Sequence, residues 1–268
     1  MNSEIDPALA PAPDALPLIQ QPADTYWHFM PGDRRLRYGD GRRVRVGEVM
    51  TVDVPPVLCT SGLHASRRAI DAMHFQVGPW VSLVTLGGWV VHGSNKSVGT
   101  ERMALWIAPA EIILKHFACD EAETLLRRFE ALGEIIDPVL SNALAVRRAF
   151  LDGKVGLLDC LSAHKAVVKY ESPGRSALFV RDVVSLAVRC NISSYYAASC
   201  TANLNKQAAA FIQCEAGAAI DAYAAEESAV AESNERLTQM LLLARANVQV
   251  EFAALNNLLD TGGGDVLR

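Results

Sequence analysis

Several patterns that would assign a compartment are missing from this sequence. No apolar run approaches the ~20 residues that a membrane-spanning helix requires, so we expect no membrane segment. The first 24 residues lack the basic start and apolar block of a secretory signal, and we expect a cytoplasmic protein. The 6 cysteines of the 268-residue chain are scattered and include no C-x-x-C pair, which favours reduced, packed thiols over a disulfide framework.

Motifs for nucleotide binding and catalysis are also missing. The chain has no G-x-S-x-G, no G-x-G-x-x-G after a predicted strand and no G-x-x-x-x-G-K-[ST]. The spacing of Cys59, His64 and His74 fits no zinc site. A net charge of -5 with 21% charged residues gives no general reason to expect nucleic-acid binding. We therefore expect neither a cofactor nor a bound metal.

What the sequence does contain divides into four stretches. Residues 1–24 hold five of the 12 prolines and suit an extended arm. Residues 25–108 show strand and turn patterns, residues 109–260 show helical patterns, and residues 261–268 are a flexible tail. The chain is therefore predicted to be an α+β protein with a small β-rich head followed by an all-helical body.

Hydrophobic alternation predicts the strands of the head. Residues 42–54 alternate valine with charged residues, which is typical of half-buried strands, broken here at Gly47. Residues 80–93 are more continuously apolar and should form a strand bulged at Gly87-Gly88. One short helix is expected over residues 67–75.

The body is predicted from its helical periodicity. The long stretch 195–259 has no proline and a single glycine, Gly217, so it suits either one long helix or two helices split near that glycine. Before it, helices are expected at about 109–133, 137–151, 155–169 and 175–190.

The last part of this stretch carries an apolar stripe through Leu237, Leu241, Val248, Phe252 and Leu259. The stripe exceeds what a solvated helix needs. We predict that it is buried either inside the body or at a two-fold interface, which would make the protein a homo-oligomer.

The corner "LCTSGLHAS" at residues 58–66 combines three residue types that can react. Cys59 is predicted to end a buried strand as a packed thiol, and Ser66 to cap a helix that starts at Arg67. His64 is predicted to lie at the mouth of a cleft, just before a helix N-terminus, which favours anions.

Two H-x-S units, at His64 and His92, would suit a two-histidine phosphodiesterase, in which one imidazole acts as base and the other as acid. Such enzymes place each histidine in a separate lobe. The 28 residues between the two units leave little room for a lobe, so this is the weaker enzymatic hypothesis.

A basic hairpin follows the first predicted strand. Basic and aromatic residues on a hairpin can bind phosphate backbones or stack on bases. The alternative is a solvated hairpin whose arginines pair with carboxylates of the same chain. The candidate binding residues are Arg34, Arg35, Arg37, Arg42, Arg43 and Arg45, together with Tyr38.

A set of short motifs runs through residues 27–120: Trp27 with Phe29, "YGDGR" at 38–42, "LCTSGLHAS" at 58–66, "LGGWVV" at 86–91 and "ERMALW" at 101–106. In combination these motifs resemble an uncharacterised family of bacteriophage and prophage proteins. Residues 207–241 are similar to the alanine-rich helical tail of that family. The resemblance implies a phage origin and action in the host cytoplasm, and it implies no activity.

The head also loosely resembles ADP-ribosyltransferase-type folds, and that resemblance implies that His28, Ser66 and Glu101 could hold and activate a nucleotide. Our first expectation is a phage-encoded accessory protein that binds a protein partner of the host or phage, for host interaction or anti-defence. Nucleic acid is a second possible partner, which the arginine hairpin would bind. The alternative is a nucleotide-processing enzyme with His28, His64, Ser66 and Glu101 as catalytic residues. Convergence of these four side chains on one pocket would distinguish the two.

Overall fold

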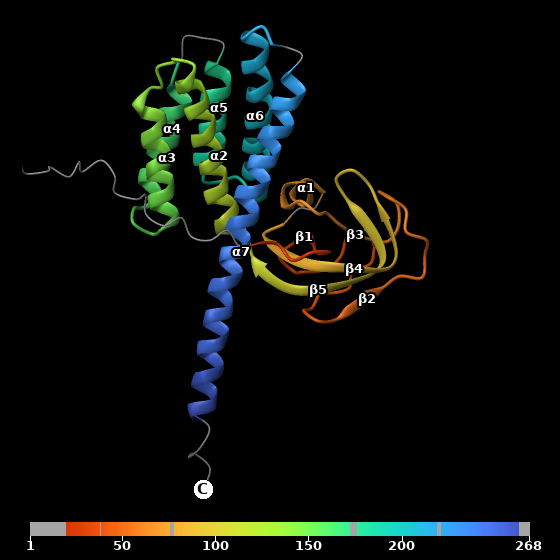
Figure 1. The fold of residues 1–268 in the computed structure, drawn as a ribbon. Coiled ribbons are helices and arrows are strands. Elements are labelled where there is room, and N and C mark those ends of the chain that lie inside the picture. The colour runs from red at the N-terminus through yellow and green to blue at the C-terminus, as the bar shows by residue number, and fades with distance from the viewer. Residues whose placement is uncertain (1–19, 38, 76–77, 172–175, 219–220, 263–268) are drawn as a thin grey trace, which may run out of the picture.

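The computed structural model describes residues 20–37, 39–75, 78–171, 176–218 and 221–262, with the side chains of the last helix described as far as Arg245. The α+β class is confirmed (Figure 1). The strands are β1 (Tyr26–Met30), β2 (Val49–Thr51), β3 (Leu63–Ala65), β4 (Trp80–His92) and β5 (Ser97–Pro109), with the short helix α1 (Ala69–Phe75) between β3 and β4. The body consists of α2 (Glu111–Ala131), α3 (Pro138–Leu151), α4 (Leu157–Lys169), α5 (Ala177–Val188), α6 (Ser194–Glu215) and α7 (Ala222–Gly262).

The sheet is antiparallel, in the order β1-β4-β5-β2, and β3 pairs with the first residues of β5. Trp27 of β1 and Ser66, just after β3, exchange two backbone hydrogen bonds of 2.7 and 3.0 Å, so the pairings run in a ring from β1 through β4, β5 and β3 back to β1. The expected bulge in β4 is confirmed by a register shift between Gly87 and Val90. The head is therefore a strongly curved sheet that encloses side chains on its concave face.

The break expected at Gly47 is confirmed, because Gly47 takes a φ of +77° and the chain turns away there. The strands expected on its two sides are shorter than predicted, since residues 42–54 contribute the three residues of β2 and isolated bridges at Arg43 and Val46. Another expectation about the head is wrong. Cys59 does not end a buried strand. It is exposed, in a turn with a φ of +65°, where the chain reverses between the bridged residues Val57 and Ser61.

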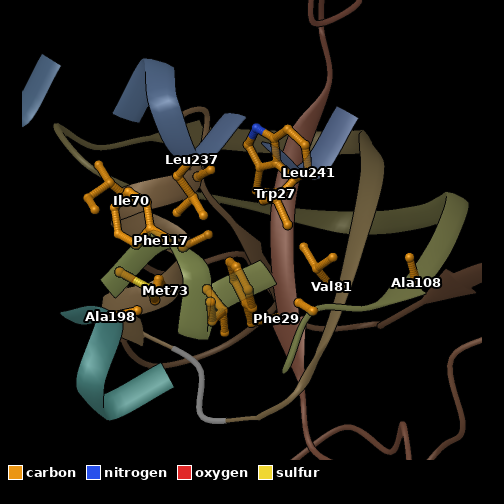
Figure 2. Close-up of a cluster of buried hydrophobic side chains, with 14 of the residues drawn as sticks. Trp27, Phe29, Ile70, Met73, Val81, Ala108, Phe117, Ala198, Leu237 and Leu241 are labelled. Carbon is orange, nitrogen blue, oxygen red and sulfur yellow. The ribbon is translucent and has the colours of Figure 1, made fainter. Parts of the chain in front are cut away.

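The head and the body share one hydrophobic core (Figure 2). Trp27 and Phe29 point from β1 toward Phe117 of α2 and toward Leu237 and Leu241 of α7, and all five side chains are completely buried. The prediction of burial for the α7 stripe is thus confirmed at Leu237 and Leu241, which pack inside the chain. The side chains of Val248, Phe252 and Leu259 lie outside the described residues.

The helical body agrees closely with the periodicity of the sequence. The split of residues 195–259 near Gly217 is confirmed, because Gly217 takes a φ of +76° between α6 and α7. A second core joins α2, α3, α4, α5 and α6 around Phe129, Leu140 and Val184, with Val167 as the contribution of α4. In the part of the chain that the structure describes, no helix combines the length and apolarity needed to cross a bilayer.

A buried carboxylate ties three helices of the body together. Glu121 of α2 is completely buried and accepts hydrogen bonds from Asn205 of α6 at 2.9 Å and from Ser233 of α7 at 2.7 Å, and it forms an ion pair with Arg236 of α7. These partners satisfy a charge that would otherwise be costly inside the body, so we assign the group a structural role.

Candidate functional site

A cleft of about 520 Å³ opens into the head between the arginine hairpin, residues 34–45, and the corner at residues 57–66. Residues of β1 and β5 form its floor. The corner, the end of α1 and Lys96, which precedes β5, form its rim. The cleft lies on the side of β1 and β5 that carries His28 and Arg102, and Trp27 and Ala72 of the shared core also contribute to its lining.

Two polar side chains form the floor. His28 of β1 is 4% exposed and Arg102 of β5 is 3% exposed. Alternation along the strands explains this placement, because Trp27 and Phe29 face the shared core and leave His28 on the other face. Arg102 donates from Nη1 to the main-chain carbonyl of His64 at 2.7 Å. Its Nη2 and the Nδ1 of His28 have no hydrogen-bond partner among the described residues.

Unpartnered polar atoms at this depth are unusual, since buried polar groups in proteins nearly always have a partner. Leaving such an atom without one costs about 1–3 kcal/mol. Both atoms belong to residues that line the cleft. The arrangement is therefore that of a site whose hydrogen bonds are completed by a ligand or by water.

The cleft is electropositive although the whole chain is acidic. Arg37, Lys96 and Arg102 line it, and within the described part of the chain its single lining carboxylate is Asp40, which is bound to Arg42 at 2.7 Å. Burial lowers the pKa of Arg102 to about 10, so this guanidinium remains charged at neutral pH. The net charge that a ligand meets in the cleft is positive.

Desolvation and the nearby charge of Arg102 lower the pKa of His28 well below its usual value, so its imidazole is neutral at pH 7. A neutral imidazole can donate from one nitrogen and accept at the other. His28 therefore adds a hydrogen-bonding group beside the guanidinium without adding a second buried charge.

His64 lies at the rim of the cleft, and both of its ring nitrogens are engaged by the backbone. Its Nδ1 is 3.2 Å from the carbonyl of Gly62, and its Nε2 accepts from the backbone N–H of Cys59 at 3.1 Å. These two contacts assign the neutral tautomer with the proton on Nδ1, and burial lowers its pKa. The ring holds the corner in shape, and neither nitrogen is free for proton transfer.

Ser66 also lines the cleft, but it does not cap a helix. Its main chain pairs with Trp27 in the sheet, and α1 begins at Ala69 rather than at Arg67. The predicted cap is therefore wrong. The side chain that accepts from the first turn of α1 belongs to Asn234 of α7, which takes the N–H of Ile70 at 3.3 Å.

Glu101 does not join the other three candidate catalytic residues. His28, His64 and Ser66 all line the cleft, whereas Glu101 is exposed on the opposite face of β5, because it neighbours Arg102 and the side chains of a strand alternate. His92 is not among the residues that line the cleft and contacts Ser97 Oγ at 2.9 Å. The structure thus does not bring together the complete set of four, and it does not place His64 and His92 in one cleft as a two-histidine phosphodiesterase would require.

The arginines of the hairpin have separate environments. Arg37 lines the cleft, and Tyr38 lies outside the described residues. Arg42 and Arg45 pair with Asp40 and Glu48. The guanidinium of Arg34 lies 4.9 Å from the ring centre of Trp80. Arg35 donates to the carbonyl of Gly41 at 2.8 Å. Arg43 is exposed, and its backbone forms an isolated β-bridge with that of Arg35.

Sequence reasoning missed the two cations that matter most in the cleft, Arg102 and Lys96. A signal for Arg102 was present, since it stands in phase with Ala104 and Trp106 in the alternating strand and so had to be a buried arginine. Lys96 follows a turn, and nothing in the local pattern places it beside the corner.

Comparisons of the chain with models of protein families, with curated proteins and with solved structures find no match. Among the described residues there is also no group of three or more histidine, cysteine or acidic side chains that could hold a metal ion. The geometry of the cleft is therefore the basis on which a function can be assigned.

Proposed function

We propose that the protein acts by binding, and that the cleft of its head takes a phosphate-bearing ligand of nucleotide size. The observation that carries this proposal is the pair of unpartnered atoms on the floor, Nη2 of Arg102 and Nδ1 of His28, both on side chains that are more than nine-tenths buried. Their positions at the base of an electropositive cleft support an anion as the completing group.

The chemistry of the floor favours phosphate over a simple halide. A guanidinium presents its N–H groups in a planar fork that matches the oxygens of phosphate, and charge-assisted hydrogen bonds of this kind are strong. Nη1 of Arg102 donates to the main-chain carbonyl of His64, and this bond fixes the direction of the N–H groups on Nη2. Lys96 and Arg37 at the rim add positive charge for a second phosphate oxygen or a second phosphate group.

The size and lining of the cleft favour an organic phosphate. A volume of about 520 Å³ lies within the range of small-molecule sites. Phe75 at the end of α1 lines the cleft and is 37% exposed, and the ammonium of Lys96 lies 4.1 Å from its ring centre. The ammonium covers one face of this ring, and the exposed part of the ring supports an apolar contact with the base of a nucleotide.

The same geometry favours binding over catalysis. A general base needs a free acceptor within reach of the substrate. The imidazole of His64 is engaged on both sides, Asp40 is bound to Arg42, and Glu101 is on the other face of the sheet. His28 has a free ring nitrogen, but burial lowers its pKa well below the usual value, so it is a weak base at neutral pH. In this proposal a small phosphorylated ligand takes the place of the macromolecular partner that we expected from the sequence. The resemblance to phage proteins supports the host cytoplasm as the compartment in which the protein binds it.

Isothermal titration calorimetry with inorganic phosphate, adenosine monophosphate and adenosine tests the proposal. We expect binding of the two phosphates, with the nucleotide tighter, and none of the uncharged nucleoside. Arg102→Met should weaken phosphate binding about tenfold to a hundredfold, as expected for the loss of a hydrogen bond to a charged group. Absence of phosphate binding by the native protein would overturn the proposal.

Matched variants separate a binding defect from a folding defect. Arg127→Met removes an exposed arginine of α2, far from the cleft, and should leave the affinity unchanged. Lys96→Met removes a half-buried rim cation that the sheet does not need, so it should weaken binding while the far-ultraviolet circular dichroism and the melting temperature stay the same. Equal affinities for the native protein, Arg102→Met and Lys96→Met would place the ligand elsewhere.

A further inference from the structure

Two cysteine sulfurs meet inside the helical body, far along the chain from the cleft. Cys160 near the start of α4 is completely buried, and Cys190 follows α5 and is partly exposed. Their Sγ atoms are 2.8 Å apart, and both also lie near the carbonyl of Val188. Two thiols in direct contact, 30 residues apart in the sequence, need no large movement of the backbone to approach each other further.

A buried arginine accompanies the two sulfurs. Arg147 of α3 is 2% exposed, and its Nη1 lies 3.6 Å from Cys160 Sγ and 3.3 Å from Cys190 Sγ. Its Nε has no hydrogen-bond partner among the described residues. A guanidinium placed this way stabilises negative charge on sulfur, which is the form of cysteine that reacts.

We propose that Cys160 and Cys190 are an oxidation site and form a disulfide when the protein meets a hydroperoxide. Cys190, the more exposed thiol, attacks one peroxide oxygen as its thiolate, so that an S–O bond forms, the O–O bond breaks, and alkoxide or hydroxide leaves and takes up the proton that the Cys190 thiol released. The thiolate of Cys160 then attacks the sulfur of the resulting sulfenic acid, and hydroxide leaves and takes up a proton to become water. In sum, two thiols and one hydroperoxide give one disulfide, one water and one alcohol or second water.

The environment makes this a slow reaction with a lasting product. Burial, and then the contact with Cys160, raises the pKa of the Cys190 thiol to about 11, so little of its thiolate is present at neutral pH. Once formed, the disulfide is enclosed between α3, α4 and the end of α5, where a reductant has limited access.

Oxidation attaches α4 covalently to the segment that follows α5. This helix buries only Cys160 and Val167 among its described side chains, and it leaves Leu157, Leu158 and Val168 more than half exposed. In the reduced protein α4 is therefore held by little apolar burial and should open easily. The disulfide links its first turn to the chain just after α5 and removes that opening.

Mass spectrometry of the full-length protein after mild treatment with hydrogen peroxide tests the proposal. Remaining thiols are alkylated under denaturing conditions, and the protein is digested without reduction. We expect a linked pair of peptides containing Cys160 and Cys190, a rise in melting temperature of about 5–10 °C, and slower amide hydrogen exchange in α4. Recovery of both cysteines as alkylated thiols after oxidation would overturn the proposal.

Two variants complete the test. In Cys190→Ser, which changes a partly exposed side chain, peroxide should no longer raise the melting temperature or slow exchange in α4. In Cys214→Ser, which removes an exposed thiol of α6, the linked peptides and both effects should remain. If Cys190 is instead recovered as a sulfinic acid in the native protein, Cys160 does not resolve it, and the proposed disulfide is wrong.

Discussion

The side chain of Asn234 on α7 accepts a hydrogen bond of 3.3 Å from the backbone N–H of Ile70 in the first turn of α1, although 164 residues separate the two in the sequence. A helix N-terminus carries N–H groups without an intrahelical partner, and a side-chain oxygen usually supplied by the preceding residues satisfies one of them. In this protein the helical body supplies that side-chain oxygen. The position of α1, which ends at the cleft, is thus tied to the long helix of the body.

Asn234→Ala should therefore destabilise the protein by about 1 kcal/mol, the usual cost of a lost helix cap. Ser66→Ala, at the position that the sequence suggested as the cap, should change the free energy of unfolding by less, because the hydrogen bonds that hold Ser66 come from its main chain. Urea unfolding of the two variants measures the difference. A larger loss for Ser66→Ala than for Asn234→Ala would contradict this assignment.

His28 should make the stability depend on pH. Its pKa is lowered in the folded protein by burial and by Arg102, so the unfolded chain binds a proton near pH 6.5 that the folded chain does not. Because the unfolded state then holds more protons, the free energy of unfolding should fall as the pH is lowered below about 6.5, with a slope of at most about 1.4 kcal/mol per pH unit for this group.

His28→Gln should make that slope shallower. Part of it should remain, since the pKa values of His64 and His164 are also lowered, chiefly by burial. Thermal unfolding followed between about pH 5.5 and pH 7.5 measures the slope. An identical pH profile for the native protein and His28→Gln would show that the imidazole is not held neutral on the floor of the cleft.

Leu241 of α7 is completely buried in the core that the head and the body share. Leu241→Asp should destabilise the protein by about 4 kcal/mol, since it puts an unpaired carboxylate among apolar side chains and removes their packing. Leu243→Asp, two residues further along the same helix and 42% exposed, is the matched control and should cost less than about 1 kcal/mol. Similar melting temperatures for the two variants would contradict the burial of Leu241.

The arginine hairpin should bind nucleic acid weakly or not at all at physiological salt. Two of the six hairpin arginines, Arg42 and Arg45, pair with Asp40 and Glu48, which reduces the positive charge that can release counterions from a phosphate backbone. A gel-shift assay with a DNA duplex should show no complex at about 0.15 M salt. The variant in which Arg43 and Arg45 are both changed to alanine should keep the phosphate affinity of the cleft, since it leaves Arg42 in place to pair with the lining carboxylate of Asp40. A salt-sensitive complex that this variant loses would favour the hairpin as a nucleic-acid site.

Much of the fold could be predicted from local sequence, and the reason is periodicity. The helices from α2 to α7 repeat apolar residues near every third or fourth position, and Gly217 breaks the last stretch where a left-handed turn is needed. The bulge of β4 could also be predicted, from the adjacent glycines Gly87 and Gly88. The start of α1 was not, because its N-terminal partner comes from Asn234, far along the chain.

The candidate site was predicted in part. The corner at 58–66 contributes to the cleft, with His64 at its rim and Ser66 in its lining, and His28 lies on its floor. Glu101 is excluded by the alternation of β5, which places it on the face opposite Arg102, and this signal was already present in the sequence. The positive charge of the cleft could not be predicted, because the acidic chain brings Arg37, Lys96 and Arg102 together only by folding.

The amino-acid sequence by itself determined the class of fold, the order of its elements and the apolar stripes that must be buried, since these depend on residues a few positions apart. Tertiary structure alone decided that Trp27 and Leu241 share a core, that Asn234 completes α1, and that Arg102 and His28 meet with atoms unpartnered in an electropositive cleft. These contacts join residues from strands and helices far apart in the chain, and the energy of each depends on burial, which exists only once the sheet has curved and the body has packed against it.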